Sequence, residues 1–293
     1  MKQIGQYTQG VIYVVLSYVC WGVLPLYWKH LDAIPSVDIL AHRVVWSSVF
    51  TLAWCLLIKR RYLRNYFSSP KALVRLTVTG LIVAVNWGVY IYAINSGQMV
   101  EAALGYFINP LVSIVLGMTF LGEKLNRTQL VAFLFAMAGV AYLTINYGHF
   151  PWIAIALAVT FGVYGLLKKQ MNYDSMSALA VETTLIVPIA LGYLIWGSSD
   201  GMASFVTLDL SMIVMLVLAG IVTALPLYWF GMAAVKIPLY SIGFFQYISP
   251  TINLFIGIYI FHETFSTTHA IAFSFIWAGL ALYIGDSIVR LRR

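Results

Sequence analysis

The stretch NPLVSIVLGMTFLGEKL at residues 109–125 has a counterpart in the second half of the chain, SPTINLFIGIYIFHETF at residues 249–265. An offset of 140 residues aligns the two without a gap and pairs Pro110 with Pro250, Gly117 with Gly257 and Glu123 with Glu263. The same offset aligns two further blocks, residues 21–29 with 161–169 and residues 132–141 with 272–281. One register held across three separate blocks predicts an internal duplication.

The second copy departs from the first at a position that matters for a turn. His262 stands where the first copy has Gly122, and glycine is the residue that tight turns use for left-handed backbone. The replacement therefore argues against a tight turn at residue 262.

The composition decides the environment of the chain. Of its 293 residues, 61% are hydrophobic and only 9% are charged, and the mean hydropathy is +0.88. Soluble domains carry roughly 25% charged residues, so this exterior must face lipid. That excludes a cytosolic or secreted enzyme, a nucleic-acid-binding domain and a disulfide scaffold. Cys20 and Cys55 fall inside apolar runs, where we expect them to pack as small apolar residues.

A helix needs about 20 mostly apolar residues to span a bilayer. Ten such runs are present, at residues 8–28, 36–58, 76–95, 101–121, 127–146, 149–167, 178–197, 209–233, 239–261 and 268–289. The links between them are short, so consecutive helices must be antiparallel neighbours. The predicted fold class is an all-α integral membrane protein with ten transmembrane helices.

The basic residues predict the orientation, since lysine and arginine gather in cytoplasmic segments. If the N-terminus is cytoplasmic, fifteen of the seventeen fall on that side: Lys2, Lys59, Arg60, Arg61, Arg64, Lys71, Arg75, Lys124, Arg127, Lys168, Lys169, Lys236, Arg290, Arg292 and Arg293. Lys29 is then outside and Arg43 lies within the membrane. Both termini are therefore predicted to be cytoplasmic.

Each half of the chain contains five of these spans. An odd number means that the second half, residues 147–293, enters the membrane the opposite way round from the first, residues 1–146. Inverted repeats are typical of secondary transporters, whose substrate site lies where the repeats meet. We expect the two repeats to form one transport domain. The alternative is an old duplication kept only for packing.

Three further stretches identify a family: AHRVVWS at 41–47, EAALGYFINP at 101–110 and FQYISPTIN at 245–253. Together with the aligned segments 110–123 and 250–263, they resemble the drug/metabolite transporter superfamily in its EamA-type, ten-helix form, and its RarD branch in particular. The resemblance covers essentially the whole chain. It implies secondary transport of small metabolites across the bacterial inner membrane, with export as the expected direction and drugs as a further class of cargo. It does not fix the substrate.

The aligned prolines point to a cavity. Pro110 and Pro250 lie inside predicted spans, where proline cannot donate its N–H and clashes with the carbonyl four residues back. Irregular backbone at membrane depth is tolerated where it is buried or lines a polar cavity. The kinks therefore predict lining residues close to each proline: Tyr106, Phe107, Asn109, Gln246, Tyr247 and Ser249. A packing kink satisfied by a neighbouring hydroxyl is the alternative.

Charged groups inside the spans are the candidates for substrate binding, because they normally face a partner or a wet cavity. Arg43 could bind a carboxylate or phosphate through its planar fork, or form a structural pair with Glu101. Glu182 could face a substrate ammonium or carry a coupling proton, or pair with Lys168 or Lys169. Glu101 and His42 are further proton-coupling candidates, and His42 could equally be a hydrogen-bonded core residue.

Aromatic residues make up 15% of the chain. Trp21, Trp87, Tyr90 and Tyr164 lie well within spans, and the Asn86 amide adds hydrogen bonding beside Trp87. We expect these five to line the cavity, although ordinary helix packing is the alternative for each ring. Residues near span ends are expected in the interfacial belt: Trp28, Tyr62 and Trp152.

Arg43, Glu182 and the rings together favour amino acids or related zwitterions and organic anions as cargo. The sequence contains no P-loop and no His-Glu-x-x-His motif, and we expect no cofactor, no metal and no nucleic acid. An uncoupled facilitator stays open, and a membrane enzyme acting through Glu182 and His42 is a remote alternative.

The small-residue stretches 136–141 and 276–281 could pack within the repeat or form a homodimer contact.

Overall fold

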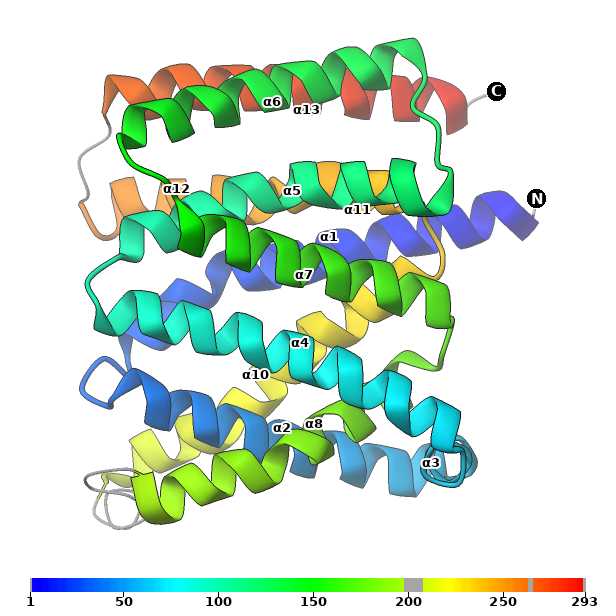
Figure 1. The fold of residues 1–293 in the computed structure, drawn as a ribbon, viewed down its shortest axis with the longest axis vertical. Coiled ribbons are helices and arrows are strands. Elements are labelled where there is room, and N and C mark those ends of the chain that lie inside the picture. The colour runs from blue at the N-terminus through cyan, green and yellow to red at the C-terminus, as the bar shows by residue number, and fades with distance from the viewer. Residues whose placement is uncertain (1, 198–207, 263–265, 292–293) are drawn as a thin grey trace.

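The computed structural model describes residues 2–197, 208–262 and 266–291. Within these ranges ten helices are long and apolar enough to cross a membrane, which confirms the all-helical fold and the ten spans. They are α1 (Lys2–Lys29), α2 (Ser36–Ile58), α4 (Pro70–Asn95), α5 (Met99–Leu121), α6 (Arg127–Tyr147), α7 (Trp152–Met171), α8 (Ser175–Gly192) continued by the π-helical turn η1 (Tyr193–Gly197), α10 (Leu210–Ala234), the pair α11 (Leu239–Gln246) and α12 (Ile248–Tyr259), and α13 (Thr267–Leu291) (Figure 1).

The third span begins earlier than predicted. Helix α4 starts at Pro70, because proline suits the first helical turn. Its first turns also carry Lys71 and Arg75, which a search for apolar residues rejects. A short helix that the sequence did not predict, α3 (Arg60–Phe67), precedes it, and Leu63 is its buried residue.

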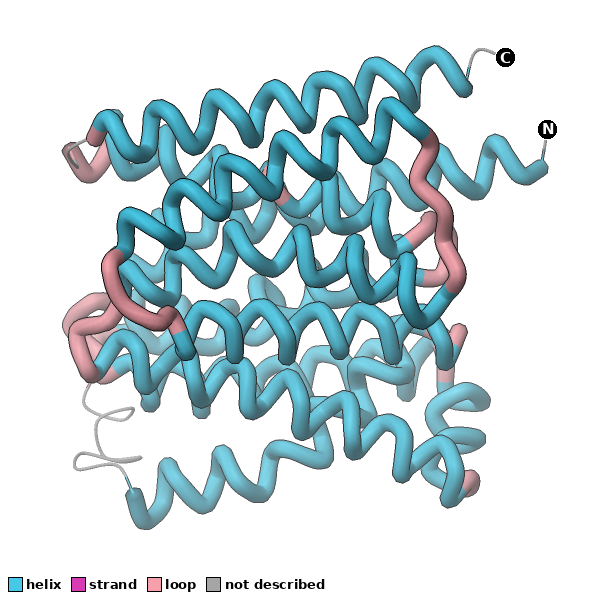
Figure 2. The backbone as a smooth tube through the Cα atoms, turned by 45° about the horizontal axis from the view of Figure 1, so that its top comes forward, coloured by secondary structure: helices cyan, strands magenta, loops and turns pink. Residues whose placement is uncertain are grey.

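The main packing pairs join the two halves of the chain (Figures 1 and 2). At one edge α6 lies along α13, and next to them α5 packs against α7 and α11. At the other edge α2 packs against α8 and α10, while α1 contacts α10 and α12. The two halves therefore share one core.

Glycines set the close approach of α6 and α13. A Cβ atom at Gly139 would lie 2.6 Å from the Ala272 carbonyl oxygen, and one at Gly279 would lie 2.6 Å from the Ala132 carbonyl oxygen. Helices α6 and α13 thus pack on each other across the two halves. Of the two alternatives, packing within one repeat is not found, and the homodimer contact stays a prediction.

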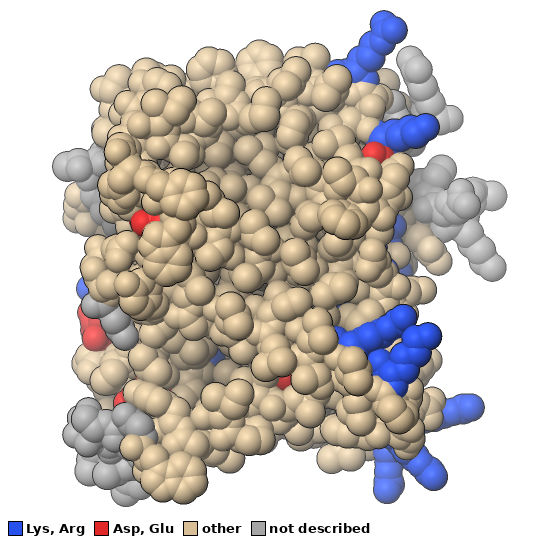
Figure 3. Space-filling view, in the orientation of Figure 1, with Lys and Arg blue, Asp and Glu red and all other residues tan. Residues whose placement is uncertain are grey.

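Both described termini lie at the same end of the bundle (Figure 1), and lysines and arginines gather at that end in Figure 3. The links at this end, which we call the basic end, are residues 59–69, 122–126, 172–174 and 235–238. The clustering on which the predicted orientation depends is therefore present in the fold. Glu263, Arg292 and Arg293 lie outside the described residues.

The two predicted kinks differ. Helix α5 runs unbroken through Pro110, whereas the ninth span divides at Tyr247, three residues before Pro250. The backbone at His262 also differs from expectation. It has φ of 56°, close to the 64° at Gly122, so the argument against a turn at residue 262 was wrong. Histidine is among the residues that enter this region more readily than most.

An ion pair ties the basic end together. Lys59, just after α2, donates to Asp174, which also accepts a hydrogen bond from the Ser177 amide at the start of α8. Burial alone would raise the pKa of the Asp174 carboxyl, but the hydrogen bonds from Lys59 and Ser177 outweigh it and hold that pKa below the ordinary 3.8. Burial would lower the pKa of Lys59, yet Asp174 raises it above 10.5.

We expect this pair to contribute stability across the neutral range and to lose it in acid. A carboxylate with a lowered pKa in the fold stabilises above its unfolded pKa, and the contribution disappears as pH falls through the folded pKa. The midpoint temperature of thermal unfolding in detergent should therefore fall less steeply with decreasing pH, below pH 3.8, for Asp174→Asn than for the wild type. Asp32→Asn, at the exposed Lys29–Asp32 pair, is the control. Equal acid sensitivity of Asp174→Asn and wild type would contradict this expectation.

Candidate functional site

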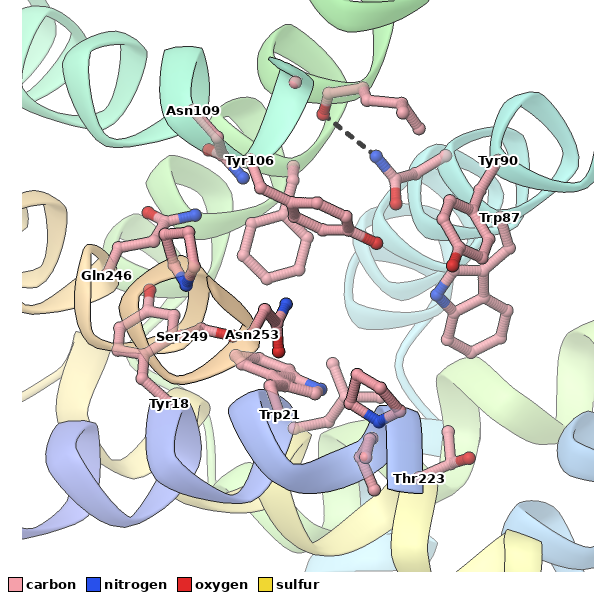
Figure 4. A pocket seen from close by; sticks show the side chains of 18 of the residues that line it. Tyr18, Trp21, Trp87, Tyr90, Tyr106, Asn109, Thr223, Gln246, Ser249 and Asn253 are labelled. Atoms are coloured by element: carbon pink, nitrogen blue, oxygen red, sulfur yellow. Dashed lines mark hydrogen bonds between the residues drawn. The ribbon is translucent and has the colours of Figure 1, made fainter. Parts of the chain in front are cut away.

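A cavity of about 180 Å³ lies between helices of both halves (Figure 4). Helix α1 contributes residues from its second half, such as Trp21 and Trp28, and α7 contributes Leu157 and Phe161 from its first half. Both sets lie toward the end of the bundle opposite the basic end. The cavity is therefore displaced toward that opposite end.

Arg43 is the charged residue of the lining. It lies two turns into α2, where its Nε donates to Thr223 Oγ1 at 2.9 Å. Its guanidinium carbon is 4.6 Å from the centre of the Trp28 ring and 5.7 Å from that of Trp87. Cation–π contacts of this kind stabilise a cation in an apolar setting. Trp28, which was predicted for the interfacial belt, thus faces the cavity.

The alternative pairing of Arg43 with Glu101 is also wrong. Glu101 is 1% exposed and accepts hydrogen bonds from the Ile153 amide at 2.6 Å and from the Tyr147 hydroxyl at 3.2 Å. A carboxylate at the first turn of a helix satisfies free N–H groups there and complements the helix dipole. Glu101 therefore secures the start of α7, and among the described residues no carboxylate lies within ion-pair distance of Arg43.

Amide side chains occupy the end of the cavity away from Arg43. Asn109, Gln246 and Asn253 point into it with Tyr18 and Ser249 nearby (Figure 4). Among the described residues, the amide oxygens of these three and the Tyr18 hydroxyl have no hydrogen-bond partner. Leaving a buried polar group unsatisfied is costly, which indicates that a bound molecule or water completes this end.

Aromatic rings form the walls between the two ends. Tyr90 and Tyr106 meet edge to face with ring centres 6.2 Å apart, and Trp21 and Phe161 do so at 5.6 Å. Asn86 belongs to the wall, because its amide nitrogen donates to the Leu157 carbonyl at 2.9 Å and to Thr160 Oγ1 at 2.8 Å. The structure thus brings nine of the predicted lining residues together: Trp21, Arg43, Asn86, Trp87, Tyr90, Tyr106, Asn109, Gln246 and Ser249.

Three other predicted residues do not line the cavity. The Tyr247 hydroxyl donates to the Phe107 carbonyl at 3.3 Å, and the Phe107 ring packs on Phe273. Tyr164 is fully buried and stacks on Phe230, with ring centres 6.0 Å apart. Phe230 in turn contacts the lining residues Trp21 and Phe161. Tyr164 and Phe230 therefore form the floor beneath the cavity.

Glu182 lies beyond this floor. Its two carboxylate oxygens are each 3.0 Å from Lys168 Nζ, and it also accepts from Thr79 Oγ1 at 2.6 Å and Tyr164 Oη at 3.3 Å. Glu182 is 1% exposed and Lys168 is 5% exposed. The structural alternative of a Lys168 partner is therefore present, and Glu182 does not reach the cavity. His42 is buried in α2 and is likewise outside the lining.

Sequence reasoning missed Tyr18, Thr223 and Asn253. Asn253 could have been found, because it follows Gln246 and Ser249 at spacings that place all three on one helical face. Nothing in the sequence singles out Thr223, whose role depends on the approach of α10 to α2.

Comparison with known proteins gives consistent matches. Residues 8–145 match the EamA-like transporter family. The chain is 45% identical to the uncharacterized transporter YojE of Bacillus subtilis (strain 168), over 94% of this chain and 93% of that protein. It is 39% identical to Protein RarD of Streptomyces exfoliatus over 100% of this chain and 93% of that protein, and 36% identical to Protein RarD of Escherichia coli (strain K12) over 98% of both. A solved crystal structure shares the fold, with a TM-score of 0.72 at 18% identity over 94% of this chain and 96% of that one.

Proposed function

The chain belongs to the EamA-like transporter family, in its RarD branch, and from this membership we propose that it is a secondary active transporter that works by alternating access. Its cargo is small metabolites, namely amino acids or related zwitterions and organic anions, with drugs as a further class, and its direction is export. The observation that carries the proposal is the cavity between the two halves, where Arg43 has no carboxylate partner among the described residues.

Residues 1–146 and 147–293 act as inverted repeats in this proposal. Reciprocal contacts support the relation: Gly139 approaches Ala272 while Gly279 approaches Ala132, and each pair follows from the other by the offset of 140. Phe135 and Phe275, which are equivalent residues, meet with ring centres 6.1 Å apart. The packing of α1 on α10 and α12 likewise corresponds to that of α7 on α4 and α5.

Contacts at the basic end support an alternating mechanism. Glu123, beyond the end of α5, accepts from the amides of Leu239 and Tyr240 at 2.8 and 2.9 Å. The Lys169 ammonium of α7 lies 3.8 Å from a carboxylate oxygen of Glu123. These contacts join the halves at that end, while the cavity lies toward the other. We assign this conformation to the outward-facing state, and exchange of the two repeats' conformations then produces the inward-facing one.

The basic end faces the cytoplasm of a bacterial cell in this proposal, and the membrane is the inner one. The gathering of lysine and arginine at that end (Figure 3) supports the orientation through the positive-inside rule. Both termini are then cytoplasmic.

Coupling to protons would use a titrating group linked to the cavity, and Glu182, Glu101 and His42 are the candidates. A second function, uncoupled facilitation or exchange, is favoured by a specific observation: Glu182 and Glu101 both lie outside the cavity and both are held by protein partners.

Transport into proteoliposomes tests the proposal. We expect the purified protein to catalyse counterflow of labelled amino or carboxylic acids, and Arg43→Lys to raise the apparent KM by about tenfold or more, because lysine keeps the charge but loses the bidentate fork. Lys29→Gln, at an exposed pair, is the control and should leave KM unchanged. Absence of counterflow by the wild type would reject transport, and an unchanged KM in Arg43→Lys would reject Arg43 as the ligand.

A further inference from the structure

The charge and donor pattern of the cavity narrows the class of cargo, an inference that rests on the proposed function. We infer that the cavity selects a molecule with one net negative charge: a monocarboxylate whose remaining polar groups are neutral, such as hydroxyl or amide. Free amino acids and other zwitterions are the weaker ligands.

Charge balance is the first reason. Arg43 is the charged residue of the lining, and the buried carboxylates of Glu101 and Glu182 have other partners. Glu101 accepts from the start of α7, and Glu182 pairs with Lys168 beneath the floor. A buried charge is costly unless it is paired. A monoanion would bring the occupied cavity to zero net charge, whereas a zwitterion would leave it at one positive charge.

The unused hydrogen bonds of Arg43 are the second reason. A guanidinium carries five N–H donors, and here Nε donates to Thr223. Among the described residues, no hydrogen bond is recorded for the four N–H groups on its two terminal nitrogens. The rings of Trp28 and Trp87 are close to the guanidinium. A carboxylate that accepts two parallel N–H bonds from the terminal nitrogens uses the fork in its strongest geometry.

The amide end is the third reason. Asn109, Gln246 and Asn253 are neutral, and each offers an NH₂ donor and a carbonyl acceptor. An ammonium placed among them would give up its hydration and meet dipoles but no carboxylate, which is an unfavourable exchange for a charge. A hydroxyl or an acylated nitrogen loses less on leaving water and can satisfy the buried amide oxygens that lack partners.

Three matched probes separate charge from shape: N-acetyl-L-phenylalanine, which is a monoanion; L-phenylalanine, a zwitterion; and N-acetyl-L-phenylalaninamide, which is neutral. The same three built on leucine and alanine cover smaller sizes. Binding to the protein in nanodiscs can be followed by tryptophan fluorescence, since Trp21, Trp28 and Trp87 line the cavity. We expect at least one N-acetyl acid to bind about tenfold or more tightly than both of its partners.

Arg43→Gln should remove this preference and Arg43→Lys should retain part of it, which separates a charge effect from a loss of folding. A zwitterion or neutral amide that binds as tightly as its N-acetyl acid would overturn the inference, as would the absence of binding by every member of all three sets. Counterflow of the same probes in proteoliposomes separates the two proposals. Arg43-dependent binding without flux would reject transport and keep the anion preference. Flux together with tighter binding of the zwitterion would support transport and reject the anion preference.

Discussion

Replacing Glu182 with glutamine is expected to lower the free energy of unfolding by about 3–5 kcal/mol, because Lys168 would remain charged in a buried site without its carboxylate. Both side chains are almost fully buried, and both carboxylate oxygens lie 3.0 Å from the ammonium. Thr79 and Tyr164 donate to different carboxylate oxygens, and glutamine keeps only one acceptor oxygen. The loss therefore reports the charge together with one hydrogen bond. Unfolding in mixed micelles by SDS titration measures it.

The double variant Lys168→Met/Glu182→Gln is the matched control. It removes both charges at similar volume, and replacing a whole buried pair in this way is often close to neutral. We therefore expect most of the lost stability to return. A double variant as unstable as Glu182→Gln would show that the hydrogen bonds of the carboxylate matter more than its charge.

The same pair of variants tests coupling. If Glu182 carries the coupling proton, gradient-driven export should lose its dependence on the pH gradient in both variants. Full gradient-driven flux in the stable double variant would remove Glu182 from the coupling mechanism.

The second large effect is expected at Gly220, where α10 crosses α2. A Cβ atom there would lie 2.6 Å from the Ser47 amide nitrogen and would also collide with the Trp46 backbone. Because the obstacle is backbone, it cannot move aside cheaply, and Ser47 Oγ also donates to the Gly220 carbonyl at 3.0 Å. We expect Gly220→Ala to destabilise the fold by about 3 kcal/mol. It should also weaken cargo binding, because Thr223, one turn further along, holds Arg43.

Gly88→Ala on α4 is the control for Gly220→Ala. A Cβ atom at Gly88 would meet no atom within 4 Å, and alanine is favoured over glycine inside a helix by about 1 kcal/mol. The thermal unfolding temperature should therefore fall in Gly220→Ala and rise in Gly88→Ala. Fluorescence titration should show weaker cargo binding in Gly220→Ala and unchanged binding in Gly88→Ala. Equal stabilities for the two would contradict the collision expected between a Cβ atom at residue 220 and the α2 backbone.

The helices could be predicted from the sequence because lipid imposes one strong rule, a run of about 20 apolar residues for each span. Helical segments that are short or carry basic residues do not follow this rule, and the sequence did not predict them. Lys71 and Arg75 concealed the first turns of α4, and α3 is too short and too basic to register. The break at Tyr247 was anticipated near Pro250, but nothing in the sequence distinguishes it from the unbroken α5 around Pro110.

The sequence predicted which residues line the cavity better than it predicted which residues pair with each other. Arg43, Trp87 and Gln246 were expected in the lining and line it, because polar groups and kinks at membrane depth are rare enough to stand out. The partners were harder to predict. Glu101 was expected to lie nearer in depth to Arg43 than Glu182 does, yet it contacts the start of α7. Which faces of two helices meet depends on their rotation and crossing, and depth alone does not fix either.

The contact of α6 with α13 has a consequence for biosynthesis. Helix α6 ends at Tyr147, and its main partner, α13, begins at Thr267. The ribosome therefore completes all the spans between them before α13 emerges. During this interval the glycine face of α6 must be covered by lipid or by the translocation machinery. The first half of the chain therefore cannot reach its final packing when its own synthesis ends, and α13 completes the packing of both halves at once.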